Sequence, residues 1–164
     1  RDDINFFLYE SKEFKGDSVI RQFASVMDIA PTILDIANIE HPQNKYSGRN
    51  IHPIKGQSIL PMLINDNKPE LSNNRITGWE LFNRRAVRAG SWKITWIEKP
   101  YGKGRWVLYD LENDPLEEYD LATTNPAKLK EMIALWDEYE KENGVIIDQD
   151  LNLGYSGKNF HFKH

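Results

Sequence analysis

The chain has 164 residues, of which 40% are hydrophobic and 12% aromatic, and this suits one compact domain or slightly more. With 21 Lys and Arg against 25 Asp and Glu, the formal net charge is −4. This balance argues against a general nucleic-acid binder, because such proteins must neutralise phosphates. The absence of cysteine excludes disulfides, zinc–thiolate sites and thiol catalysis. The mean hydropathy of −0.64, with no long apolar run, predicts that no segment spans a membrane.

The first 74 residues predict one strand, one helix and many turns. The apolar run at residues 4–9 is typical of a buried strand, which must pair with a strand elsewhere. Within residues 23–39, four apolar residues share one helical stripe: Ile29, Ile33, Ile36 and Ala37. Asp28 is the expected N-cap of this helix and Asn38 its left-handed stop. Residues 40–74 are rich in turn signals, and residues 58–63 predict a helix of one or two turns.

From residue 75 onward the pattern changes to short strands. Residues 76–82, 85–89, 92–97 and 105–111 each predict a strand, and their short connections favour an antiparallel meander. A helix is expected to begin at Pro126 and to end before Gly144. Its apolar stripe consists of Leu129, Met132, Ile133, Trp136 and Tyr139. Because this stripe needs a cover, the sequence predicts an α+β fold in which a C-terminal helix packs on a four-stranded antiparallel sheet.

Several polar groups could bind a metal ion, but their sequence contexts favour other interpretations. Asp2-Asp3 precedes an apolar run instead of following one, and Asp66-Asn67 lies in a polar loop. Asp148, Asp150 and Asn152 have calcium-loop spacing, but the positions for the required Gly and Glu are occupied by Leu153 and Asn159. We therefore expect no metal ligand in this chain. For the four histidines, His41, His52, His161 and His164, loop packing or exposure is favoured over a metal or catalytic role.

Basic and aromatic residues alternate in the predicted sheet. Arg84, Arg85 and Arg88 lie among Trp79, Phe82 and Trp92. Such a surface could stack nucleic-acid bases, but the acidic total favours cross-strand packing, in which arginine stems cover aromatic rings.

Two segments carry a more specific signal. One spans residues 26–37, VMDIAPTILDIA, and the other joins residues 78–82, 85–93 and 106–115, which read GWELF, RAVRAGSWK and WVLYDLENDP. Residues 46–49 and 56–63 lie between them, in a matching order. Over about residues 18–146 the chain resembles the C-terminal third of arylsulfatases of the alkaline-phosphatase-like superfamily, and it is most similar to the bacterial type. Asn38 and Asn83 stand where that family commonly has glycine, and both tolerate a left-handed backbone.

The resemblance implies hydrolysis of a sulfate ester by a formylglycine that is made from Cys or Ser within Cys/Ser-x-Pro-x-Arg, aided by a calcium ion. No proline of this chain has Cys or Ser two positions before it, so the motif does not occur here. The resemblance places the formylglycine, the calcium ligands and the sulfate-binding Lys and His upstream of these residues. We therefore expect no catalytic residue and no cofactor here, and the N-terminal catalytic part of the same polypeptide as the partner.

On this interpretation residues 1–74 are the last strand and helix of a truncated α/β sulfatase domain, with its loops. Residues 75–145 are a small C-terminal subdomain, and residues 146–164 are a tail. In the resembling fold this subdomain lies beside the active-site cleft, so Trp79, His52 and Arg85 are candidates to contact the organic part of the substrate. For Trp79, packing in the core or on the sheet is favoured over that role. The chain begins with Arg1 and shows no signal segment, and we expect it to be a piece of a longer chain. Its compartment is unknown, although the family is often periplasmic or secreted.

Two other functions remain open at this point. The first is a non-enzymatic binding module that uses the aromatic and arginine-bearing sheet. The second is an independent metal-binding protein that uses residues 148–152.

Overall fold

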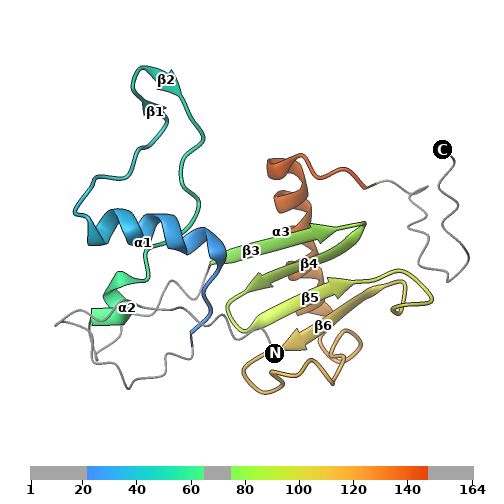
Figure 1. Ribbon diagram of the computed structural model, residues 1–164. Helices are drawn as coiled ribbons and strands as arrows, with labels where there is room; N and C mark the ends of the chain where they lie inside the picture. Colours follow the sequence, from blue (N-terminus) through green and yellow to red (C-terminus); the bar gives the residue numbers. More distant parts are fainter. Residues whose placement is uncertain (1–21, 65–74, 148–164) are drawn as a thin grey trace, which may run out of the picture. The chain divides into compact units, whose positions relative to one another are not determined.

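The computed structural model describes residues 22–64 and 75–147 (Figure 1). The chain divides into two compact units, residues 1–71 and 72–164. The strand expected at residues 4–9 and the tail from residue 148 lie outside the described residues. In the part that is described, no helix is both long and apolar enough to cross a bilayer.

The first unit begins with a 3₁₀ turn, η1 (Val26–Asp28), which continues directly into the helix α1 (Ile29–Ile36). Asp28 occupies the N-cap position of α1, as expected, but its side chain makes no capping bond to that helix. Instead, Ser25 and Asp28 form a capping box around η1, in which the Asp28 carboxylate accepts a hydrogen bond from the Ser25 N–H at 2.7 Å. Asn38 has φ +52°, which confirms the left-handed stop.

The burial of α1 is opposite to that of an ordinary amphipathic helix. Asp28, Pro31 and Thr32 are buried, whereas the apolar stripe of Ile29, Ile33 and Ile36 is exposed. The buried side is linked by hydrogen bonds to the segment that precedes α2 (Leu60–Ile64). Gln57 N–H donates to Asp28 Oδ1 at 2.8 Å, and Ile59 N–H donates to Thr32 Oγ1 at 3.0 Å. Among the described residues, specific polar bonds therefore link α1 to the segment before α2.

A small hairpin lies in the segment between the two helices. Strands β1 (Lys45–Tyr46) and β2 (Arg49–Asn50) pair antiparallel. Ser47 (φ +48°) and Gly48 (φ +77°) form its two-residue turn. The sequence indicated the turn, but two-residue strands are too short to show a period.

The second unit contains the predicted meander. Strands β3 (Ile76–Leu81), β4 (Arg84–Ala89), β5 (Trp92–Trp96) and β6 (Trp106–Asp110) lie in chain order in one antiparallel sheet. The β3–β4 turn has Phe82 at φ +55° and Asn83 at φ +65°. Asn83, which stands where the resembling family commonly has glycine, therefore adopts a left-handed backbone. Phe82 has the same conformation.

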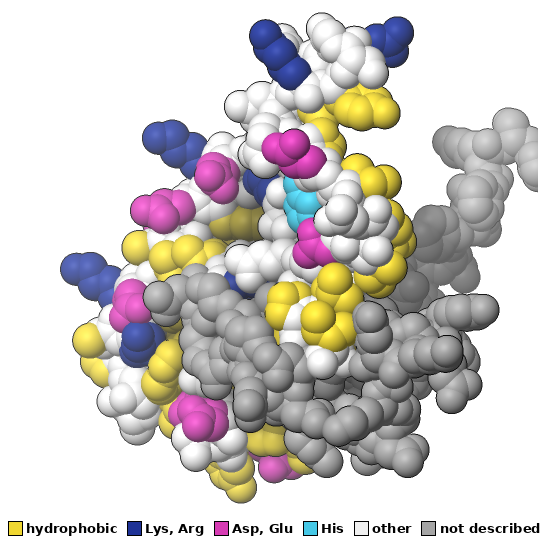
Figure 2. Space-filling view, turned by 90° about the vertical axis from the view of Figure 1, so that its left-hand side faces the viewer, with side chains coloured by type: hydrophobic (Ala, Val, Ile, Leu, Met, Phe, Trp, Pro, Cys, Tyr) yellow, Lys and Arg dark blue, Asp and Glu magenta, His cyan; other side chains and the backbone are white. Residues whose placement is uncertain are grey.

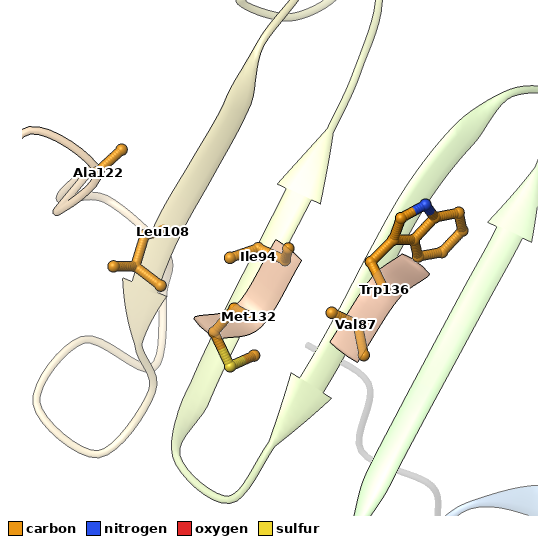
Figure 3. Close-up of a cluster of buried hydrophobic side chains, with 6 residues drawn as sticks. All are labelled: Val87, Ile94, Leu108, Ala122, Met132 and Trp136. Carbon is orange, nitrogen blue, oxygen red and sulfur yellow. The ribbon is translucent and has the colours of Figure 1, made fainter. Parts of the chain in front are cut away.

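One face of the sheet is covered by α3 (Pro126–Asn143), as Figure 1 shows. Val87, Ile94 and Leu108 project from three neighbouring strands, and Met132 and Trp136 come from α3 (Figure 3). All five are fully or almost fully buried. The predicted packing of the α3 stripe on the sheet is confirmed, and this cluster is the core of the unit.

The ends of α3 follow the expected signals. Pro126 is its first residue, where the missing N–H costs nothing, and Gly144 ends it with φ +61°. Gly78 of β3 lies directly beneath the helix: a Cβ there would be 2.6 Å from atoms of the Tyr139 ring. The glycine thus allows the tyrosine to rest on the sheet.

The long connections around β6 are fixed by one carboxylate. Asp120 accepts hydrogen bonds from Lys103 Nζ and Arg105 Nη2, each at 2.7 Å, and from the Ala122 N–H at 3.0 Å. Burial alone would raise the pKa of Asp120, but these bonds outweigh it and hold the pKa far below its usual range. The side chain therefore remains ionised and holds the loop before β6 to the loop after it.

Candidate functional site

The three predicted cleft residues are distributed over both units and, within the second unit, over both faces of the sheet. In the register of the sheet, Trp79 is opposite Ala86 and Glu80 is opposite Arg85. Because side chains alternate along a strand, Trp79 and Arg85 lie on opposite faces. Gly78 and Val87 pair with each other and mark the side of α3, so Arg85 shares the helix face and Trp79 lies on the other face. His52 belongs to the other unit.

Arg85 is engaged in packing. Its guanidinium carbon lies 4.4 Å from the centre of the Trp96 ring, and its Nε–H donates to the Asn83 carbonyl at 3.3 Å. Arg84, its neighbour, forms an ion pair with Glu98 at 3.0 Å. This agrees with the expectation that arginine stems cover aromatic rings.

Trp79 is 40% exposed and lies on the face of the sheet away from α3, which we call the outer face. The residues of the outer face follow from the register: Thr77, Trp79, Leu81, Arg84, Ala86, Arg88, Lys93, Thr95, Val107 and Tyr109. Among the three candidates, Trp79 has the largest aromatic ring. A half-exposed indole on a rigid strand can stack on a flat or ring-shaped organic group.

The outer face also carries a charged cluster. Arg88 and Lys93 are directly opposite each other on β4 and β5, an arrangement that is unfavourable without a counter-charge. Glu117 supplies it by pairing with Lys93. Glu117 has φ +58°, a conformation that bulky residues seldom adopt, so the loop holds this carboxylate over the sheet at a cost in backbone strain. Burial raises the pKa of the Tyr109 hydroxyl, and the negative charge of Glu117 raises it further.

His52 follows β2 and is exposed. The structure therefore describes it as an exposed loop residue.

The first unit contains a hollow with a mixed polar and apolar lining, which the sequence did not indicate. It has a volume of about 630 Å³ and is lined by residues from α1, the turn after it and α2. On the face of the molecule shown in Figure 2, a histidine side chain lies between acidic ones and beside hydrophobic ones. His41 Nε2 and Asp35 Oδ1 are 2.8 Å apart. Hydrogen bonds from Ser58 and then His41 lower the pKa of Asp35.

The order of these groups does not make a nucleophile. In a hydrolase triad the histidine stands between the serine and the carboxylate, so that it can take the hydroxyl proton. Here Asp35 bonds both Ser58 and His41, so the carboxylate, and not the histidine, is the hydrogen-bond partner of the hydroxyl. The turn after the helix contains His41, but a separation of six residues between Asp35 and His41 is not a recognisable sequence motif.

The described residues also do not bring together the side chains of a metal site. Within residues 22–64 and 75–147, no three His, Asp or Glu side chains come close enough to share a metal ion. The acidic groups at residues 2–3, 66–67 and 148–152, and the histidines at 161 and 164, lie outside the described residues. The described residues therefore do not fit a calcium site.

Comparisons with known proteins identify relatives of the chain. It is 38% identical over 136 residues to an uncharacterized sulfatase of Schizosaccharomyces pombe, which covers 83% of this chain and 24% of that protein. It is 31% identical over 123 residues to Arylsulfatase K of Xenopus laevis, covering 69% of this chain and 21% of the relative. A solved 2-O GAG sulfatase matches 75% of the chain with a TM-score of 0.50 and 26% identity, over 27% of its own length. No family model matches the chain.

These matches define the class of protein. The antiparallel sheet with its C-terminal helix has the fold of a segment of solved sulfatases. The chain belongs to the sulfatase family. It spans about a quarter of the length of the relatives that it matches.

Proposed function

We propose that this chain is a C-terminal piece of a sulfuric ester hydrolase, which contributes structure and one wall of the substrate cleft but none of the reacting groups. One observation carries the proposal: the chain is 38% identical to a sulfatase over 83% of its own length, yet spans only 24% of that protein and lacks a Cys/Ser-x-Pro-x-Arg motif. A hydrolase of this type needs that nucleophile, which must then lie elsewhere in the polypeptide.

The contribution of this chain is positional. The four-stranded sheet is the support, and the exposed indole of Trp79 is the group on it that we assign to contact with the organic part of a sulfate ester. Arg85 packs on the Trp96 ring, and His52 is an exposed loop residue. We therefore assign the contact with substrate to Trp79 and not to these two residues. In the intact enzyme a calcium ion and a formylglycine would supply Lewis-acid and nucleophilic chemistry, and neither has candidate residues in the described part.

The proposal is tested by the coding sequence upstream of Arg1 and by turnover. We expect a Cys/Ser-x-Pro-x-Arg motif upstream, and no release of 4-nitrophenol from 4-nitrophenyl sulfate by the isolated chain with added calcium. Turnover above a buffer blank would show that a nucleophile exists within these residues. An authentic start codon directly before Arg1 would favour a non-enzymatic binding module.

A further inference from the structure

Four side chains that end in hydrogen-bond donors form a row across the outer face of the sheet. Thr77 is opposite Arg88, Arg88 is opposite Lys93, and Lys93 is opposite Tyr109. Each residue belongs to a different strand, and directly opposed Cβ atoms are separated by about 4.5–5.5 Å. We call this set the donor row. Its hydroxyl, guanidinium and ammonium groups, arranged in one line, suit the recognition of a carboxylate or a sulfate group.

The Thr77 hydroxyl is enclosed by protein and yet has no hydrogen-bond partner among the described residues. Thr77 is 3% exposed, and its Oγ1 neither donates to nor accepts from any group within residues 22–64 and 75–147. Buried hydroxyl groups are hydrogen-bonded in nearly all proteins, so an unpartnered one requires an explanation. Because Thr77 belongs to the same row as two cations, an oxyanion bound there would give its hydroxyl the acceptor that it lacks.

Glu117 is a carboxylate that acts on both cations of the donor row. It forms an ion pair with Lys93. Burial lowers the pKa of Arg88, and the attraction of Glu117 offsets only part of this effect. Arg88 Nε–H donates to the Gly90 carbonyl at 2.9 Å, which orients the guanidinium. The two cations and Glu117 together carry one positive charge, which suits a ligand group with one negative charge.

The Tyr109 hydroxyl contributes a donor and not a charge. Burial raises its pKa, and the charges of Glu117, Asp120 and Asp114 raise it further, so the phenol keeps its proton at neutral pH. Such a hydroxyl can accept a hydrogen bond from Thr95 and donate another one to a ligand. Asp120 is held by the two cations described above, and Asp114 accepts hydrogen bonds from two backbone N–H groups of its own loop. These two carboxylates therefore stabilise the loops around β6.

Trp79 lies beside the donor row on the same face of the sheet. It comes two residues after Thr77 on β3 and is opposite Ala86, which comes two residues before Arg88 on β4. Trp79 and Arg88 are therefore diagonal neighbours, and their separation of about 7–8 Å is within reach of long side chains. A ring that stacks on Trp79 can thus present an acidic group to Arg88.

We propose that the donor row binds a carboxylate or sulfate group on the organic part of the sulfate ester, while the ring of that organic part stacks on Trp79. The inference rests on the proposed function and specifies the substrate class, which is sulfate esters that carry a second negative charge on the ring. The Thr77 hydroxyl and the Arg88 guanidinium bind the oxygens of this second group, and Glu117 holds Lys93 beside them. The row binds and positions the substrate and takes no part in the hydrolysis itself.

Anion binding can be measured on the whole 164-residue chain by NMR titration at physiological ionic strength. The probes are benzoate and benzenesulfonate, and benzamide is the neutral analogue with the same ring. Binding is followed through the indole N–H of Trp79 and the backbone N–H of Arg88. Thr77→Val removes the hydroxyl and keeps the shape of the side chain, and Arg88→Gln removes the charge. Arg85→Gln is the matched control, because Arg85 lies on the same strand but on the helix face.

We expect both anions to give saturable shifts and benzamide to bind at least about tenfold more weakly, because hydrogen bonds to a charged group are stronger. Thr77→Val should weaken anion binding about tenfold, through the loss of one such bond. It should not lower the urea midpoint, because the hydroxyl has no partner among the described residues. Arg88→Gln should remove the preference for the anions over benzamide, whereas Arg85→Gln should retain the affinity of the wild type.

The absence of saturable shifts, equal affinity for benzoate and benzamide, or unchanged anion affinity in Thr77→Val would overturn the inference. An equal loss of affinity in Arg85→Gln and Arg88→Gln would show a general attraction to the charge of the strand and would overturn it as well. Tighter binding of benzoate assigns the row to a carboxylate, and tighter binding of benzenesulfonate assigns it to a second sulfate; either order supports the site. If Arg88→Gln does not fold, Thr77→Val decides the question.

The two proposals fail in different ways, because the titration involves no turnover. A chain that does not bind the anions, but whose upstream coding sequence contains Cys/Ser-x-Pro-x-Arg, would retain the proposed function and reject the donor row as a binding site. A chain that binds the anions specifically, but whose upstream coding sequence lacks this motif, would support the site and count against the proposed function.

Discussion

The Asp28 carboxylate accepts a hydrogen bond from the backbone N–H of Gln57 at 2.8 Å, across a separation of 29 residues. Asp28 is fully buried, and its second oxygen accepts from the Ser25 N–H. The chain approaches so closely here that a Cβ on Gly56 would lie 1.8 Å from the Met27 carbonyl oxygen. Asp28 therefore both starts the helix and fixes the loop that returns to it.

Asp28→Ala should destabilise the first unit, because it leaves two partly buried N–H groups without their acceptor. A fully buried group of this kind costs about 1–3 kcal/mol, which sets the upper limit for each of these two. Amide hydrogen exchange should speed up at Ser25 and Gln57 relative to the wild type. Asp28→Asn, which keeps one acceptor oxygen, should show a smaller increase; identical exchange in all three proteins would contradict this role.

Trp136→Ala should strongly destabilise the second unit. Trp136 is 1% exposed, and its ring centre lies 5.7 Å from that of Trp106 and 5.6 Å from that of Tyr139. Removing a buried tryptophan costs about 3–5 kcal/mol through lost burial and the cavity that remains. Urea unfolding followed by tryptophan fluorescence measures the change. Glu138→Ala, on the exposed side of the same helix, should leave the midpoint nearly unchanged, and an unaltered midpoint for Trp136→Ala would reject the packing.

Gly78→Ala tests the contact between β3 and α3. The added Cβ would be 2.6 Å from three Tyr139 ring atoms, so the ring must move. Overpacking of this kind costs about 1–3 kcal/mol. In a double-mutant cycle, Tyr139→Ala should abolish most of the penalty, because the clash needs both partners. Additive effects in the cycle would show that the strain arises elsewhere.

Asp120→Asn should lower stability at neutral pH and change its dependence on pH. Because the folded-state pKa lies below the unfolded one, the carboxylate stabilises the fold fully above about pH 4, and this contribution declines as the pH falls toward the folded pKa. Hydrogen bonds to a charged group are worth about 1.5–3 kcal/mol each, so we expect a loss of at least that size at pH 7.

The difference in melting temperature between wild type and Asp120→Asn should therefore shrink between pH 5 and pH 2, as about three pH units cover the titration. Asp137→Asn is the control, because Asp137 is exposed on α3. A difference that stays constant over this range would show that the charge of Asp120 is not the cause.

The sheet and α3 could be predicted from the sequence because their signals are local. Trp92, Ile94 and Trp96 alternate with Lys93 and Thr95, and the structure places the first three on the helix face. Pro126 and Gly144 fix the ends of α3 by their backbone geometry alone. The observed strand ends differ from the predicted ones by one residue, because a strand ends where its pairing partner ends.

The α1 stripe shows where such reasoning stops. Ile29, Ile33 and Ile36 predicted the helix correctly, but the described residues bury Asp28 and Thr32 instead. A pattern indicates which face needs a cover and does not say whether the cover belongs to the same chain.

The candidate site could be predicted only in part, because it depends on register. Trp79 and Arg85 are six residues apart and both adjoin the β3–β4 turn, but whether they share a face is decided by the two-residue turn. The bond between His41 and Asp35 depends on how the chain returns after α1, and no local pattern encodes that return.

In the four-stranded sheet β3, β4 and β5 each pair with the strand that comes next in the chain. Such a sheet requires no long loop to close before its first contacts form, and low contact order favours rapid folding. During synthesis, each strand can therefore pair with the strand before it as soon as it has left the ribosome. The second unit is thus suited to fold through contacts between successive strands as soon as it has been synthesised.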